Sequence, residues 1–243
     1  MRIRLEKVMV TVVRENLLCV QQRIEAAARR TGRKPEEITL IGVSKTHPAA
    51  VIREGFEAGI RHFGENRVQE WEGKRSGVED LAAKWHLIGH LQSNKAARAA
   101  KIFHSVDSVD DFGLAERLNR ARSEAGLAET LRVLIEVHIA KEETKSGAEI
   151  EEIPALAEKM AALPRLELVG LMCIPPYFED AEQVRPHFAR LRGLQDDLEK
   201  RLGHALPVLS MGVSHDFEVA IEEGATEVRV GTALFGERRA GAV

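Results

Sequence analysis

The sequence predicts an α/β protein that folds as a single (β/α)8 barrel of the TIM type, with an extra helix at its N-terminus. Three observations lead to this prediction. Eight short apolar runs recur along the chain, helical segments lie between them, and the 243 residues match the length of one such barrel. No linker or low-complexity tract interrupts residues 1–243, so we predict one domain. A doubly wound open sheet has the same alternation, and the pattern alone leaves it as a rival.

Most of the eight runs are rich in Val, Ile and Leu and lack clean polar alternation, as expected of parallel strands that are covered on both faces. They span residues 39–45, 61–66, 85–91, 103–107, 131–139, 166–172, 206–212 and 227–231.

The helical segments between the runs have recognisable ends. Residues 11–30 have the apolar spacing of an amphipathic helix that stops at Gly32. Pro48 suits the first turn of the next helix, and Gly59 its stop. The letters "SVDD" at 108–111 resemble a capping box before a further helix. Two more helices are predicted over 149–163 and 181–202.

Composition narrows the classes of function. A formal net charge of −3 gives no general attraction to nucleic acid or to acidic membranes. No apolar run is long enough to span a membrane, and the N-terminal stretch is too short and interrupted for a signal peptide. We therefore expect a cytoplasmic protein. Cys19 and Cys173 both lie in apolar runs, and we expect them to be reduced core residues.

Lys45 ends the first apolar run, in "LIGVSKTHP". Active sites of these barrels lie at the C-terminal ends of the strands. A partly desolvated lysine there has a lowered pKa and can attack a carbonyl as a nucleophilic amine, forming a Schiff base. The alternative is an ordinary lysine whose stem is buried and whose amine reaches water.

The last two loops have features of a phosphate site. The seventh run leads into "SMGVSHD" (210–216) and the eighth into "VRVGTALFG" (228–236). Each offers glycine, a hydroxyl (Ser210 or Ser214, and Thr232) and a following helix whose first amides favour an anion. The loops after strands seven and eight of such barrels often bind phosphate. The alternative is that Ser214 only caps its helix.

Arg229 lies between Val228 and Val230 inside an apolar strand. A buried guanidinium needs a partner, which would be either a glutamate inside the barrel or a ring nitrogen of a ligand. A lysine for an aldehyde, a phosphate site and an arginine for a ring nitrogen together describe pyridoxal phosphate (PLP).

A set of motifs then resembles a known family. In chain order they are "VSKTHP", "FGENRVQE", "WHLIGHLQSNK", "KSG", "GLM", "LSMGVSHDFEVAI" and "VRVGTALFG". In this order and spacing, from about Val8 to Glu237, they resemble the pyridoxal-phosphate homeostasis proteins, relatives of the alanine racemase N-terminal barrel. Val213 and Val230 stand where the family usually has methionine and isoleucine, and neither change removes a polar contact.

The resemblance implies a PLP barrel of fold type III with the cofactor held as an internal aldimine on Lys45. It implies the following further contacts: Arg229 at the pyridine nitrogen; Ser214, Gly231 and Thr232 at the phosphate, with the backbone of Met211 and Gly212; Asn66 near the ring; and His86 lining the mouth.

Other charged residues have simpler interpretations. His86 and His90 lie on a strand and turn, so the helical spacing of a metal pair does not apply, and we expect no metal. Lys145 is either a solvated loop lysine or a transient contact for the cofactor. Lys95, Arg98 and Lys101 are predicted to form a solvated helix face.

Three functions remain open. The first is a non-catalytic PLP carrier that stores or delivers the cofactor, to apo PLP-dependent enzymes among other partners, with indirect effects on amino-acid and keto-acid metabolism. The second is an amino-acid racemase or related PLP enzyme, which needs a second acid/base opposite the lysine. The chain's only tyrosine, Tyr177, is a loop aromatic or borders the pocket. The third is a cofactor-free Schiff-base aldolase. Without the second domain of the racemases, we expect a monomer.

Overall fold

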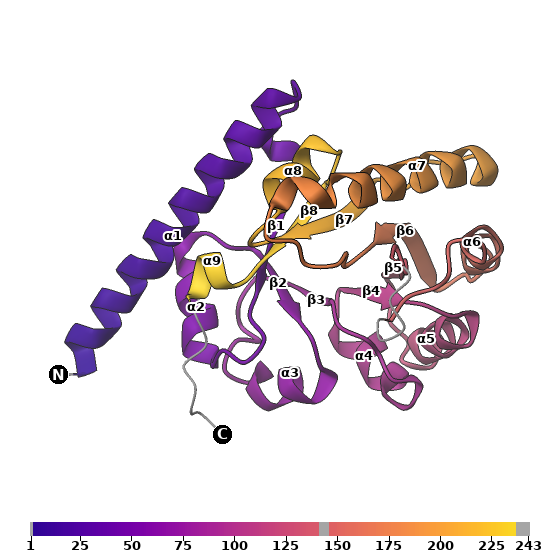
Figure 1. Cartoon of the computed structure of the whole chain (residues 1–243). Helices are drawn as coiled ribbons and strands as arrows, with labels where there is room; N and C mark the ends of the chain where they lie inside the picture. Colours follow the sequence, from indigo (N-terminus) through magenta and orange to yellow (C-terminus); the bar gives the residue numbers. More distant parts are fainter. Residues whose placement is uncertain (1, 141–145, 237–243) are drawn as a thin grey trace.

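The computed structural model describes residues 2–140 and 146–236, with side chains from residue 12 onward. Its centre is a closed ring of eight parallel strands, in which each strand pairs with the next and β8 pairs back with β1 (Figure 1). The predicted barrel is therefore confirmed, and ring closure excludes the open-sheet rival. The strands are β1 (Thr39–Val43), β2 (His62–Glu65), β3 (Lys84–Leu87), β4 (Ser105–Val109), β5 (Leu131–Glu136), β6 (Leu166–Met172), β7 (Val208–Val213) and β8 (Glu227–Val230).

A helix follows every strand and covers the outside of the ring (Figure 1). Short 3-10 turns precede β1, α4 and α7. The helices are α2 (Ala49–Ala58), α3 (Val68–Arg75), α4 (Ala96–Ile102), α5 (Phe112–Glu124), α6 (Ile153–Ala161), α7 (Arg185–Leu202), α8 (Phe217–Glu222) and α9 (Thr232–Phe235), and the turns are η1 (Pro35–Glu37), η2 (Ser93–Lys95) and η3 (Ala181–Val184).

The extra N-terminal helix is α1 (Arg2–Arg30), which begins earlier than predicted and packs outside the barrel against α2, α8 and α9 (Figure 1). Leu17, Val20 and Ile24 form its buried stripe at helical spacing. Cys19 falls between these positions and is exposed, so the expected core placement of this cysteine is wrong. Cys173, directly after β6, is buried as expected. No helix in the described ranges is long and apolar enough to cross a membrane.

The capping-box prediction before α5 is half right. Asp111 is the cap, and its carboxylate accepts a hydrogen bond from the Leu114 amide at 2.9 Å. Ser108 instead lies in β4 and donates to the Gly89 carbonyl at 2.7 Å. The strand runs on through Val109, so Ser108 cannot start the helix, and the cap falls at Asp111.

The strands of the ring carry both apolar and polar buried side chains. Leu134, Val169, Met172 and Val208 form a small buried cluster of their own, apart from the large cluster between strands and helices. Branched aliphatic residues usually fill the whole interior of such a barrel. Here other interior positions carry buried polar or charged groups, among them His86, Asp107, Glu136, Glu227 and Arg229. A buried charge costs free energy unless it is paired or hydrogen-bonded, so these polar side chains need a chemical explanation.

Candidate functional site

The C-terminal ends of β7, β8, β1 and β2 bring the predicted site residues to one mouth. Lys45 follows β1 and Asn66 follows β2, while the two glycine-containing loops follow β7 and β8. Because β1 pairs with both β2 and β8, the lysine stands between Asn66 and the β8 loop. The lysine side chain is half-buried, as expected for a group at the edge of the barrel.

A buried network fixes the strand end that carries Lys45. The Ser44 hydroxyl donates to Glu65 Oε1 at 2.5 Å, and Lys74 of α3 reaches Glu65 Oε2 at 2.8 Å. Lys74 also donates to the Ser44 carbonyl at 2.9 Å. Burial raises the pKa of Glu65, and the nearby Lys74 ammonium opposes this rise. The strand before the lysine is thus tied to both its neighbouring strand and the covering helix.

The residue after Lys45 adopts an unusual backbone conformation. Thr46 has φ of 65°, which is the left-handed region that a β-branched residue rarely enters. Glu70 of α3 accepts a hydrogen bond from the Thr46 amide and forms an ion pair with Lys74 at 3.1 Å. Burial acts to raise the pKa of Glu70, but these two donors leave it lowered. The chain therefore turns sharply away from the strand just after the lysine, and α3 holds the turn.

The two glycine-containing loops converge on a single oxygen. Ser214 Oγ accepts hydrogen bonds from the Gly231 amide at 3.1 Å and from the Ala233 amide at 3.4 Å. The helix after β7 begins at Asp216 instead, so Ser214 is not its cap. Two backbone donors that meet at one oxygen form a site suited to an anion. Thr232, between them in sequence, is exposed.

Gly212 is required where it stands. Its φ is 90°, and a Cβ there would lie 2.6 Å from the Ala220 Cβ and 2.9 Å from the Phe217 Cα. The end of β7 is therefore packed directly on α8. Met211, before it, is fully buried, and the contact of this pair's backbone with a phosphate stays a prediction.

Arg229 is 2% exposed and is held by neutral acceptors. Its guanidinium donates to Ser210 Oγ at 2.7 Å and to the Cys173 carbonyl at 2.8 Å. Among the described residues no carboxylate forms an ion pair with it, so the glutamate–arginine pair that was the structural alternative is not found. Two hydrogen bonds use only part of the five donors of a guanidinium.

His86 does not line the mouth as predicted, because its side chain is fully buried. His86 of β3 pairs with Gly64 of β2, which stands two residues before Asn66 in the chain. Its Nδ1 is 3.2 Å from Asp107, and its Nε2 is 3.0 Å from His62 Nδ1. The prediction failed because the letters "WHLIGH" do not show how far along the strand the barrel opens.

The protonation of this group follows from its contacts. Burial acts to lower the pKa of His86, but Asp107 outweighs it, so the pKa is raised. Burial and the neighbouring His86 charge lower the pKa of His62 to about 3. The Asp107 contact thus favours the protonated form of His86, and burial favours the neutral form of His62. Side-chain atoms of His86, Asp107 and Glu227 lie within 4.8 Å of one another, a spacing that a metal ion could also use.

Glu136 is a site residue that sequence analysis missed. It ends β5, which lies across the ring from β1, and its side chain is 6% exposed. Its Oε2 has no hydrogen-bond partner within the described part of the chain. Burial and the Asp110 charge raise its pKa to about 7, against the opposing effects of Arg229 and His90. An isolated charge in the apolar run "LRVLIEVHI" was the same signal that singled out Arg229.

Two further predictions concern loops. Tyr177 is 77% exposed, and its ring lies 5.2 Å from that of His215, so it stands beside the loop that carries Ser214. Lys145 lies outside the described residues. Of the predicted solvated face, Arg98 is paired with Glu72, and Lys95 belongs to η2 and is half-buried.

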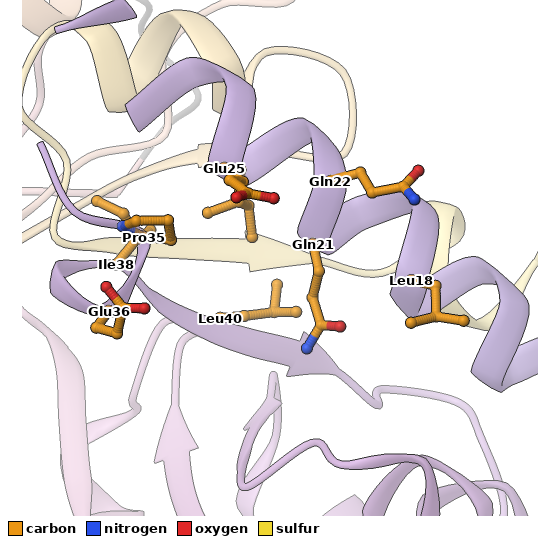
Figure 2. A pocket seen from close by; sticks show the side chains of 9 residues that line it. Leu18, Gln21, Gln22, Glu25, Pro35, Glu36, Ile38 and Leu40 are labelled. Carbon is orange, nitrogen blue, oxygen red and sulfur yellow. The ribbon is translucent and has the colours of Figure 1, made fainter. Parts of the chain in front are cut away.

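A separate groove lies outside the barrel, between α1 and the η1–β1 segment (Figure 2). Its volume is about 530 Å³, and Figure 2 shows Leu18, Gln21 and Leu40 along it, with Glu25 and Glu36 at one end. It contains no cation and no nucleophile, and none of the predicted site residues lines it.

Comparison with known proteins agrees with this geometry. Residues 16–239 match the model of the alanine racemase N-terminal domain. Two relatives named pyridoxal phosphate homeostasis protein are 47% identical (Aquifex aeolicus; 93% of this chain, 98% of the relative) and 49% identical (Pseudomonas aeruginosa; 96% and 98%). The structure of PipY from Synechococcus elongatus, solved with PLP bound, is 39% identical, with a TM-score of 0.78 over 89% of this chain and all of that one.

A more distant likeness concerns the fold alone. An alanine racemase from Clostridium difficile has a TM-score of 0.72 at 17% identity, and this chain, 95% of which is covered, corresponds to 60% of that protein. With near-complete coverage of its similar relatives on both sides, the chain belongs to the pyridoxal phosphate homeostasis protein family, whose barrel is the alanine racemase N-terminal domain.

Proposed function

We propose that this protein binds PLP through a Schiff base on Lys45 and acts in PLP homeostasis, storing the cofactor and delivering it to apo enzymes. The names of its relatives and the PLP-bound structure of PipY support this function. The observation that carries the proposal is the oxygen site made by the Gly231 and Ala233 amides. This site lies one strand from the lysine, because β8 and β1 are paired.

The residues present fit this cofactor. In the structure the Gly231 and Ala233 amides both point towards Ser214 Oγ, so two backbone donors and a hydroxyl lie together. Ser214, Gly231 and Thr232 would hold the phosphate, with the backbone of Met211 and Gly212. Arg229 would donate to the ring nitrogen, Asn66 would lie beside the ring, and His86 would support this layer from below.

PLP supplies an aldehyde for the lysine amine and an electron-poor ring that stabilises negative charge on a bound substrate. Arg229 restrains the second property. A guanidinium donates hydrogen bonds and accepts none, so Arg229 would donate to the ring nitrogen. A ring nitrogen that accepts this bond would carry no proton of its own and would draw electrons less strongly. This arrangement suits holding the cofactor better than broad carbanion chemistry.

The visible absorption spectrum of the purified protein tests the proposal. We expect a band that disappears on borohydride reduction and that is absent or shifted in Lys45→Ala. Lys74→Arg, in a lysine of the neighbouring network, should keep the band and serves as a matched control. A wild-type protein that forms no band even after PLP is added would refute the proposal, and the aldolase alternative also predicts a colourless protein.

One observation favours the racemase alternative. Glu136 is a titratable group at the end of the strand opposite β1, and its pKa of about 7 suits proton transfer near neutral pH. Exchange of the α-proton of an amino acid, followed in deuterated water, distinguishes the two functions. If the wild type does not catalyse this exchange, the carrier function is supported. If the wild type catalyses it and Glu136→Gln does not, the protein is an enzyme.

We further propose that the protein works in the cytoplasm as a monomer. Neither cysteine forms a disulfide within the described residues, which suits a reducing compartment. Size-exclusion chromatography with light scattering would contradict the monomer if it gave twice the mass of the 27.0 kDa chain.

A further inference from the structure

Two sequence motifs outside the proposed cofactor contacts meet at one cleft. Residues 66–70, from "FGENRVQE", and residues 87–95, from "WHLIGHLQSNK", line a cavity of about 720 Å³ at the C-terminal ends of β2 and β3. The two loops touch at their base, where a Cβ on Gly89 would lie 2.5 Å from the Asn66 carbonyl oxygen. The cleft therefore begins at Asn66, beside the mouth that carries Lys45.

Two cations line this cleft, and the charge of one of them, the exposed Arg67, acts on Glu70 of the same lining. Arg67 and Lys95 both line it, and no ion pair or hydrogen bond of either side chain is found among the described residues. Other cations on the adjoining helices are paired, Lys74 with Glu65 and Arg98 with Glu72. Lys95 is half-buried as a residue, which limits the directions that its side chain can take at the cleft.

The acidic groups around the cleft are already engaged. Glu70, which lines it, accepts from the Thr46 amide and pairs with Lys74 at 3.1 Å. His90, also in the lining, lies 3.4 Å from Asp110. The groups that remain for a ligand are therefore mostly donors: the Arg67 guanidinium, the Lys95 ammonium and the Gln92 amide. The first amides of α3, which has no side-chain cap at Arg67, add to the positive potential.

We propose that this cleft binds the anionic group, a carboxylate or a phosphate, of a second small molecule next to the cofactor. Its volume lies within the range of small-ligand pockets. The fork of Arg67 suits either anion in a bidentate manner, and Lys95 adds a point charge. The groove of Figure 2 has the opposite character, because its charged groups are Glu25 and Glu36. The inference that the anion belongs to a molecule beside the cofactor rests on the proposed function. The inference that the cleft binds an anion does not.

Anion titrations of ¹⁵N-labelled protein test the cleft at constant ionic strength. Inorganic phosphate and acetate are the two probes, and amide shifts of residues 67–70 and 92–95 are the readout. We expect saturable shifts in the wild type and a dissociation constant about tenfold higher in Arg67→Gln/Lys95→Gln. Arg98→Gln, which removes a paired cation next to the cleft, should bind like the wild type. The probe that binds more tightly identifies the source as phosphate or carboxylate.

Shifts that do not saturate, or that are equal in the wild type and the double variant, would overturn the proposal. The single variants Arg67→Gln and Lys95→Gln, each expected to weaken binding, keep the test valid if the double variant does not fold. Failure here is distinct from failure of the proposed function. The cofactor is reported by the absorption band and by amides 212–214 and 231–233, on the other side of Lys45.

Discussion

Replacing Glu136 with glutamine should stabilise the protein at alkaline pH and leave its stability near pH 4.5 almost unchanged. The side chain is 6% exposed, and Oε2 lacks a hydrogen-bond partner within the described residues. Burial is the largest cause of its raised pKa, and the Asp110 charge adds to it. Glutamine has nearly the same shape, so Glu136→Gln removes the ionisation with little change in packing.

The size of the stability difference follows from the pKa of Glu136. Burial raises the pKa of Glu136 from 4.5 to about 7, so the folded protein binds this proton more tightly than the unfolded chain does. As pH rises between these values, the unfolded chain loses the proton first, and the free energy of unfolding falls. The full loss is about 3 kcal/mol, reached above pH 7. The glutamine variant should not lose this stability.

Urea unfolding followed by far-UV circular dichroism, at pH 5, 6, 7 and 8 without cofactor, measures the difference. The variant should gain on the wild type steadily across this range, up to about 3 kcal/mol. Glu116→Gln, an exposed position on α5, is the matched control and should show no such trend. A difference that is the same at pH 5 and pH 8, or a variant less stable at pH 8, would refute the assigned burial of the charge.

Three further substitutions test the site and its support. Lys74→Met leaves the buried Glu65 carboxylate unpaired and should cost about 3 kcal/mol in urea unfolding, with a larger loss at pH 8 than at pH 5, where Glu65 can take up a proton. Gly170→Ala places a Cβ 1.7 Å from the Val208 carbonyl oxygen, so we expect at least about 3 kcal/mol of destabilisation, and wild-type thermal stability would contradict the close approach of β6 and β7. Ser214→Ala should raise the PLP dissociation constant about tenfold, measured by absorbance titration, and an unchanged constant would place the phosphate elsewhere.

Local patterns of residues predicted the barrel and the strand ends that form its mouth. Pro48 and Gly59 bound α2 as predicted, because helix starts and stops depend on the chemistry of one or two residues. The positions of Lys45 and Gly231 followed from counting strands, since the end of a parallel strand lies at the same edge of the barrel whichever strand it is. Errors arose where burial decided the outcome, as for Cys19, whose apolar neighbours did not show which face of α1 it occupies.

The sequence by itself therefore determined the repeating strand–helix order, the lysine at a strand end and the glycine-containing loops. The tertiary structure alone decided which side chains meet. Ring closure places β5 opposite β1 and so makes Glu136 part of the site, and it sets His86 against His62 and Asp107 below the mouth. It also gives Arg229 neutral partners and brings Arg67 and Lys95, neither of which forms an ion pair among the described residues, to one cleft. The physical reason is that desolvation and pairing depend on distances between strands and loops far apart in the chain, which a linear pattern does not contain.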